Sequence, residues 1–91
     1  MAQVEDILKG ATTEGGTRTN IVSKPGGYGQ GRADFEALGG RARVNGNVQV
    51  KDLPNGQGRA VLRNFSTDGR ATLEIQPTGG GYKEITIRYN P

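Results

Sequence analysis

Residues 59–76 read RAVLRNFSTDGRATLEIQ, and residues 83–89 read KEITIRY. Both stretches alternate apolar and polar side chains, the pattern of strands that bury one face and expose the other. Asp68-Gly69 is a turn signal that divides the first stretch into two strands. The sequence therefore predicts three neighbouring antiparallel strands with one apolar and one polar face.

The same alternation extends back to Gly40, and turn residues punctuate it at Asn45-Gly46, at Pro54-Asn55-Gly56 and again at Gly79-Gly80-Gly81. The segments between these turns are short, and each is expected to pair with the next, as in a meander. The expected strands are residues 41–44, 48–53, 59–65, 71–76 and 83–89.

The first 40 residues have a different pattern. Val4, Ile7 and Leu8 are spaced i, i+3, i+4, which predicts a short amphipathic helix over residues 3–9, and a second helix is expected over residues 30–38. Residues 11–31 are polar and rich in Gly and Thr, so we expect a loop with at most one short extended piece.

Helices followed by antiparallel strands indicate the α+β class. We expect one or two short N-terminal helices packed on a four- to five-stranded antiparallel meander sheet. A chain of 91 residues is long enough for one modest core. The expected organisation is a single domain, with residues 1–40 as its helical and loop part and residues 41–91 as its sheet.

The amino-acid composition limits the kinds of catalytic and metal-binding sites that the chain can form. The chain contains no Cys and no His, which excludes disulfides, thiolate or imidazole zinc sites and histidine-based catalysis. A net charge of +3 with a pI near 9.6 favours polyanionic partners. No apolar run approaches the length of a membrane helix, and the N-terminus lacks a signal-peptide pattern. We expect neither a metal nor a cofactor.

The polar face of the predicted sheet carries the chemistry-bearing side chains. Alternation places Ile75 and its apolar neighbours beneath the helices and turns a polar set to the other side. In this set a carboxylate, Glu74, lies between two arginines. The simplest interpretation is a solvated face with cross-strand ion pairs. The polar set is Arg63, Thr72, Glu74, Gln76, Glu84, Thr86 and Arg88.

RNA cleavage offers a more specific interpretation. It needs a base for the ribose 2′-OH and cations for the charge that develops on phosphorus. Glu74 suits the first role, and Arg63 and Arg88 suit the second. Thr72 is a further candidate for the catalytic group, and Lys24, on the long loop, could swing over the face as a phosphate ligand or acid, or could simply be solvated.

Substrate-binding candidates lie close to these residues. Ser66, at the turn before Asp68-Gly69, could orient phosphate oxygens or could only stabilise the turn. Arg70 follows the same turn, and Thr86 shares the polar face. We assign Ser66, Arg70 and Thr86 to substrate binding as a hypothesis.

Residues 60–76 and 85–89, together with the shorter strings at residues 6–10, 24–27 and 33–35, resemble the C-terminal toxin domains of bacterial polymorphic and contact-dependent growth inhibition systems. The resemblance covers most of the chain. It implies a barnase-like, colicin-type ribonuclease fold with a catalytic sheet face. The family's recurrent polar positions would correspond here to Lys24, Arg63, Ser66, Thr72, Glu74 and Arg88.

The resemblance also implies a biological setting. Such domains form the last part of a larger secreted protein, act in the cytoplasm of a target bacterium and are blocked by a cognate immunity protein. The expected activity is that of a metal-independent endoribonuclease acting on tRNA or other cellular RNA, as a monomer or in a 1:1 complex with its inhibitor. Barnase itself uses a histidine as general acid, and this chain has none, so either Lys24 or a threonine would have to donate the proton, or cleavage would have to proceed with a poor leaving-group acid.

Two other classes of protein compete with this hypothesis. A non-catalytic nucleic-acid-binding module would explain the basic charge, but such sheets usually carry aromatic stacking platforms, and only Phe65 is expected on the polar face. An immunity or adaptor domain that binds protein alone would need no arginine–glutamate cluster. The net positive charge argues against an inhibitor of a basic nuclease.

Overall fold

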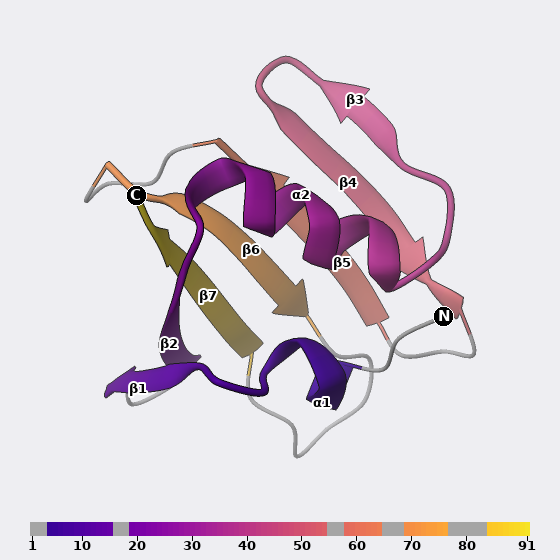
Figure 1. Ribbon diagram of the computed structural model, residues 1–91. Coiled ribbons are helices and arrows are strands. Elements are labelled where there is room, and N and C mark those ends of the chain that lie inside the picture. Colours follow the sequence, from indigo (N-terminus) through magenta and orange to yellow (C-terminus); the bar gives the residue numbers. More distant parts are fainter. Residues whose placement is uncertain (1–3, 16–18, 55–57, 65–68, 77–83) are drawn as a thin grey trace.

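The computed structural model describes residues 4–15, 19–54, 58–64, 69–76 and 84–91. Within these residues, seven strands form one sheet that carries two helices (Figure 1). The helices are α1 (Val4–Ile7) and α2 (Gly27–Ala37). The strands are β1 (Thr12–Gly15), β2 (Thr19–Pro25), β3 (Arg43–Asn45), β4 (Val48–Leu53), β5 (Gly58–Arg63), β6 (Ala71–Gln76) and β7 (Glu84–Asn90).

The sheet is mixed, with the strand order β1-β2-β7-β6-β5-β4-β3. Strands β3 to β7 follow one another as antiparallel neighbours, but β2 pairs in parallel with β7, and β1 adds an antiparallel edge beyond β2. The prediction of a four- to five-stranded antiparallel meander behind N-terminal helices is therefore wrong, and with it the barnase-like architecture. Two more strands belong to the sheet, and α2 lies between strands in the chain.

The prediction of the fold failed in one segment, residues 11–31. Residues 11–31 were predicted to be mainly loop because they are polar and rich in Gly and Thr, yet they supply β1, β2 and the start of α2. A parallel pair needs a long crossover between its strands, and here α2 and strands β3 to β6 lie between β2 and β7. Neither the pairing of β1 with β2 nor that of β2 with β7 can be recognised from the local sequence pattern.

Glycines permit the entry to α2 and its close approach to the sheet. Gly26 precedes the helix at φ 107°, in the left-handed region that side chains rarely adopt. Gly31 faces the sheet, where an added Cβ would lie 3.2 Å from the Tyr89 ring and 3.3 Å from Leu62. Because this position has no side chain, α2 can pack directly across β5, β6 and β7 (Figure 1).

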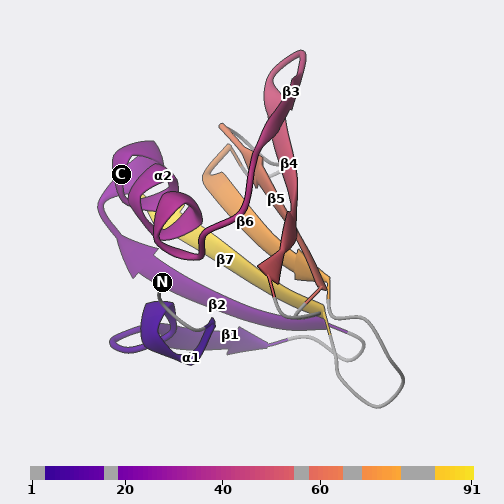
Figure 2. The same ribbon diagram turned by 90° about the vertical axis from the view of Figure 1, so that its right-hand side faces the viewer.

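The core lies between the sheet and the helices. Figure 2 shows α2 along one side of the sheet, and Ile7 of α1 joins the same buried cluster as Phe35 of α2. The sheet contributes the apolar residues that alternation predicted, which confirms that part of the sequence analysis: Ala60, Leu62, Leu73, Ile75 and Ile87 are buried, as is Tyr89, and Ile85 packs against them.

Polar groups tie the helices to this core. Lys24 of β2 donates hydrogen bonds to the Ile7 carbonyl (2.7 Å) and to Asp34 Oδ2 (2.8 Å). The Tyr89 hydroxyl donates to the same Asp34 oxygen at 2.8 Å. Lys51 of β4 is buried, donates to the Phe35 carbonyl and lies over the Phe35 ring; burial lowers the pKa of Lys51. Both helices are therefore anchored to one side of the sheet, which leaves the other side for the polar set.

Candidate active site on the polar face of the sheet

Strand register brings the predicted residues together. Arg63 on β5 pairs with Thr72 on β6, and Thr72 pairs with Arg88 on β7. Two residues further along β6, Glu74 pairs with Thr86 of β7 on the same face. Arg63, Thr72, Glu74, Thr86 and Arg88 thus occupy one face of three neighbouring strands, the face opposite the helices.

Arg63 and Glu74 form the closest ion pair of this face. Arg63 Nε donates to Glu74 Oε1 at 2.6 Å, a diagonal contact between β5 and β6. The Glu74 side chain is 20% exposed and that of Arg63 44% exposed. A charge-assisted hydrogen bond of this length holds the carboxylate in a defined position while leaving both groups accessible to a ligand.

Glu84 is a functional candidate to which sequence reasoning gave no role. Alternation along β7 places it on the same face as Thr86, diagonally across from Glu74 of β6. Burial raises the pKa of Glu84, and the interaction with the neighbouring Glu74 carboxyl group raises it further. Two carboxyl groups that share a site favour a state with one proton between them. The pair can therefore offer an acid and a base together.

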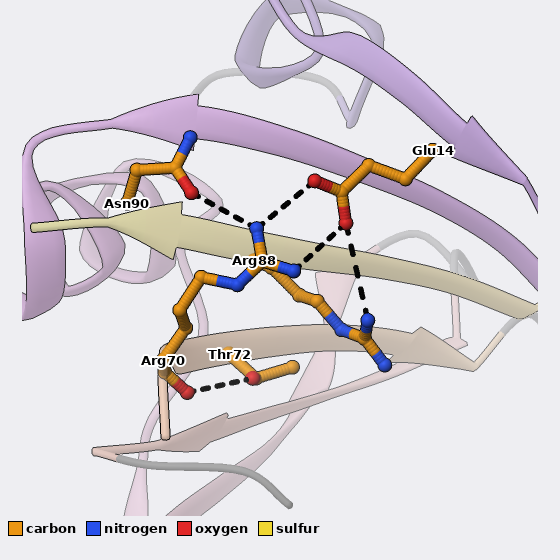
Figure 3. A network of polar contacts seen from close by, with 5 residues as sticks. All are labelled: Glu14, Arg70, Thr72, Arg88 and Asn90. Carbon is orange, nitrogen blue, oxygen red and sulfur yellow. Dashed lines mark hydrogen bonds and ion pairs between the residues drawn. The ribbon is translucent and has the colours of Figure 1, made fainter. Parts of the chain in front are cut away.

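A second cluster, which we call the Glu14 cluster, draws its residues from β1, from the start of β6 and from β7 (Figure 3). Arg70 holds the Glu14 carboxylate with two hydrogen bonds of 2.9 Å, one to each oxygen, and donates to Asn90 Oδ1 at 2.9 Å. Arg88 Nη1 lies 3.9 Å from Glu14 Oε1. The Thr72 hydroxyl donates to the Arg70 carbonyl at 3.2 Å. The cluster consists of Glu14, Arg70, Thr72, Arg88 and Asn90.

Sequence reasoning missed Glu14. The hydrogen bond from Arg70 is the main reason that the pKa of Glu14 is lowered, and the Arg70 charge, a hydrogen bond with Ser23 and the Arg88 charge act in the same direction against a smaller effect of burial. Glu14 lies on β1, within the segment predicted to be loop. The only available signal was the period-two placement of Thr12 and Glu14, which is too short to indicate a strand.

Three of the predicted site residues have surroundings that change their assignment, and a fourth is not among the described residues. Lys24 does not swing over the polar face: it is held on the opposite side of the sheet by Asp34 and Ile7, so its catalytic assignment is wrong. Thr72 is only 2% exposed, and its hydroxyl is engaged by Arg70. Arg70 does not project into solvent, because it donates two hydrogen bonds to the Glu14 carboxylate. Ser66 and the neighbouring Phe65 lie outside the described residues.

The described part of the chain contains no group of three or more Asp and Glu residues placed to hold a metal ion. Over the same residues, no helix is long and apolar enough to cross a membrane. Comparison with family models, with curated proteins and with solved structures finds no match to this chain. Arguments about function therefore rest on the site itself.

Proposed function

We propose that this domain is a metal-independent endoribonuclease whose active centre is the Arg63–Glu74–Glu84 cluster. The observation that carries the proposal is the 2.6 Å contact between Arg63 Nε and Glu74 Oε1, with a second carboxyl group, Glu84, diagonally across on the same face of the sheet. A positioned base, a group able to hold a proton and a cation are the three components that RNA transesterification requires.

The reaction can be written with these residues. The Glu74 carboxylate takes the proton of the ribose 2′-OH, and the 2′ oxygen attacks phosphorus. The bond from phosphorus to the 5′ oxygen breaks, and protonated Glu84 gives its proton to that leaving oxygen. The products end in a 2′,3′-cyclic phosphate and a 5′-hydroxyl. Glu74 is then protonated and Glu84 ionised, and transfer of the proton from Glu74 back to Glu84, directly or through solvent, restores the starting state.

Raising the pKa of Glu84 suits it to the role of acid. A carboxylic acid at its ordinary pKa is almost fully ionised at neutral pH and has no proton to donate. Burial and the Glu74 charge both favour the protonated form of Glu84. A raised pKa increases the fraction of Glu84 that holds a proton, which makes Glu84 the candidate proton donor in a chain that has no histidine.

The arginines supply the charge stabilisation. Arg63 is 44% exposed, so a phosphate oxygen can reach its guanidinium without unfolding the sheet. Arg88 lies on the other side of Thr72 in the same cross-strand row. A planar guanidinium can donate two parallel hydrogen bonds to a phosphate, so Arg63 can stabilise the charge that develops at the scissile phosphate, as a metal ion does in other nucleases, while Arg88 adds positive charge beside it for the rest of the RNA backbone.

We extend the proposal to the biological role that the sequence resemblance implies. The domain acts as the toxic tip of a larger secreted protein, enters the cytoplasm of a competing bacterium and cuts tRNA or other cellular RNA there. A cognate immunity protein would neutralise it by meeting Arg63 and Arg88 with acidic groups. The net charge of +3 is compatible with both the RNA and an acidic inhibitor.

The test is incubation of the purified domain with total bacterial RNA in EDTA. We expect cleavage by the parent protein and its loss in Glu74→Gln, while Glu36→Gln, which removes an exposed carboxylate from α2, cuts like the parent. Loss of cutting in EDTA, or cutting of a strand with 2′-deoxyribose at the scissile position, would contradict the mechanism. A parent protein that binds RNA and never cuts it would establish the alternative, a non-catalytic nucleic-acid-binding module.

A further inference from the structure

The Glu14 cluster has the geometry of an occupied anion site. Arg70 offers two N–H groups of one guanidinium to the two oxygens of Glu14, each at 2.9 Å. The planar fork that fits a carboxylate in this way fits a phosphate equally well. Arg88 approaches the same carboxylate, with Nη1 at 3.9 Å from Oε1. Two cations therefore converge on one anion.

The element that carries Glu14 is lightly held. Strand β1 has four residues and forms one end of the sheet, where it pairs with β2. Its register shifts between Thr13 and Gly15, at a bulge or a similar irregularity that includes Glu14. Bulges at sheet edges commonly redirect a side chain. Withdrawing Glu14 from the arginines would disturb an edge strand, not the core.

The site is also accessible and well placed. The side chains of Glu14, Arg70 and Arg88 are 31%, 21% and 26% exposed. Arg88 pairs across the sheet with Thr72, which lies two residues from Glu74 on β6. Two residues of a strand span about 7 Å, so a single RNA strand that presents a ribose 2′-OH to Glu74 can present a neighbouring phosphate to this cluster.

We infer that Arg70 and Arg88 form a phosphate-binding subsite and that Glu14 occupies it as an intramolecular competitor. The ligand is a phosphodiester of the RNA strand, next to the one that is cut, and it binds when the Glu14 carboxylate leaves. The choice of RNA as the source of this phosphate rests on the proposed function, whereas the anion site itself does not.

The test compares two variants with the same net charge. Glu14→Gln removes the competing charge at the subsite, and Glu36→Gln removes an exposed carboxylate from α2 on the other side of the sheet. The probes are inorganic phosphate and a 2′-O-methyl RNA oligonucleotide, which lacks the nucleophilic hydroxyl. Because a charge-assisted contact to Arg70 becomes available, we expect Glu14→Gln to bind both probes about tenfold more tightly than the parent. Glu36→Gln should differ from the parent by less than about twofold, as expected for a distant, screened charge.

Two further variants guard against a purely structural effect. Adding Arg70→Gln to Glu14→Gln should cancel the gain. If circular dichroism shows that Glu14→Gln is unfolded, Glu14→Asp decides instead, because it keeps the charge but withdraws the carboxylate by one methylene, and it should bind the probes more tightly than the parent. Equal affinities for the parent, Glu14→Gln and Glu36→Gln would overturn the inference.

The outcomes separate this inference from the proposed function. Tighter phosphate binding by Glu14→Gln in a protein that never cuts RNA supports the subsite and removes the nuclease. RNA cleavage by the parent, with no gain in affinity or rate in Glu14→Gln, supports the nuclease and removes the subsite.

Discussion

Lys24 Nζ lies 2.8 Å from Asp34 Oδ2, on the side of the sheet that carries the helices. The two side chains are 12% and 9% exposed, and the Asp34 carboxylate also accepts hydrogen bonds from Tyr89 and Gln30. The pair joins β2 to α2, and Lys24 also reaches the end of α1 through the Ile7 carbonyl. Its role follows from this position: it holds the layers together and is remote from the polar face.

Lys24→Met should therefore lower stability and leave the chemistry of the folded protein intact. Removing one partner of a buried ion pair strands the other charge and typically costs on the order of 3 kcal/mol. Urea denaturation measures the loss. Lys9→Met is the matched control, because Lys9 and Asp6 are largely exposed, and such pairs contribute about 0.5 kcal/mol. A Lys24→Met protein with parental stability and abolished RNA cleavage would restore Lys24 as a catalytic group.

Ile75 and Thr72 test the assignment of the two faces of β6. Ile75 is 1% exposed in the core, and a carboxylate there would have neither solvent nor a cation, so Ile75→Asp should fail to fold. Thr72 is also buried, but on the polar side, where its hydroxyl contacts the Arg70 carbonyl. Thr72→Ala should lose about 1 kcal/mol and stay folded. Circular dichroism and thermal melting distinguish the two, and equal folding of both variants would contradict the face assignment.

The comparison of β6 and β2 explains what sequence could predict. Strand β6 alternates Leu73, Glu74 and Ile75 between strong turn signals, so its bounds and faces follow from local pattern alone. In β2, Val22 is half-buried beneath the helices, but its strand partner β7 comes from the other end of the chain. Local sequence patterns cannot identify a partner strand that lies so far away along the chain, because the residues of one strand do not specify which other strand it pairs with.

The candidate site likewise contains residues that could be placed from the sequence and residues that could not. Arg63 and Glu74 could be placed on one face because both lie on strands that alternation reveals. The contact between Arg70 and Glu14 could not be predicted from the sequence. Glu14 comes close to Arg70 only because β1 and β2 join the sheet beside β7. Lys24 was assigned to the wrong side for the same reason: once β2 is a strand, the period of two puts Lys24 on the same face as Val22.

Glu84 gives stability a definite pH dependence. The folded state raises the pKa of Glu84 above its ordinary value of 4.5 through burial and the neighbouring Glu74. Between these two pKa values the folded protein binds more protons than the unfolded chain, so the free energy of unfolding falls as the pH rises above 4.5. Arg63 pairs with Glu74 rather than with Glu84.

Glu84→Gln removes this proton-linked loss, because the amide is neutral at every pH. Its melting temperature should decline less than that of the parent between pH 4.5 and pH 8, and at pH 8 it should equal or exceed the parental value. Glu36→Gln, on the exposed surface of α2, should follow the parental curve. A Glu84→Gln protein that loses stability more steeply than the parent as the pH rises would contradict the raised pKa.

We expect Arg63, Glu74 and Glu84 to have separate roles in RNA cleavage. If Glu74 is the base and Glu84 the acid, Glu74→Gln and Glu84→Gln should each lower the rate of RNA cleavage about 10²- to 10⁴-fold, the usual contribution of a positioned acid or base. Arg63→Gln should lower it by a comparable factor, about 10²- to 10³-fold, because it removes a donor to the developing charge. The substrate can separate the two carboxyl groups. With a leaving group that needs no proton, such as a p-nitrophenyl ester of a uridine 3′-phosphate, Glu84→Gln should recover most of its activity, while Glu74→Gln and Arg63→Gln should stay slow, since the nucleophile still needs a base and the phosphorane still needs a cation. The matched control is Gln76→Ala, on the same strand and half-buried but outside the three proposed roles. Equal impairment of Glu84→Gln on both substrates would assign Glu84 to positioning Glu74 and leave the proton donor elsewhere on this face.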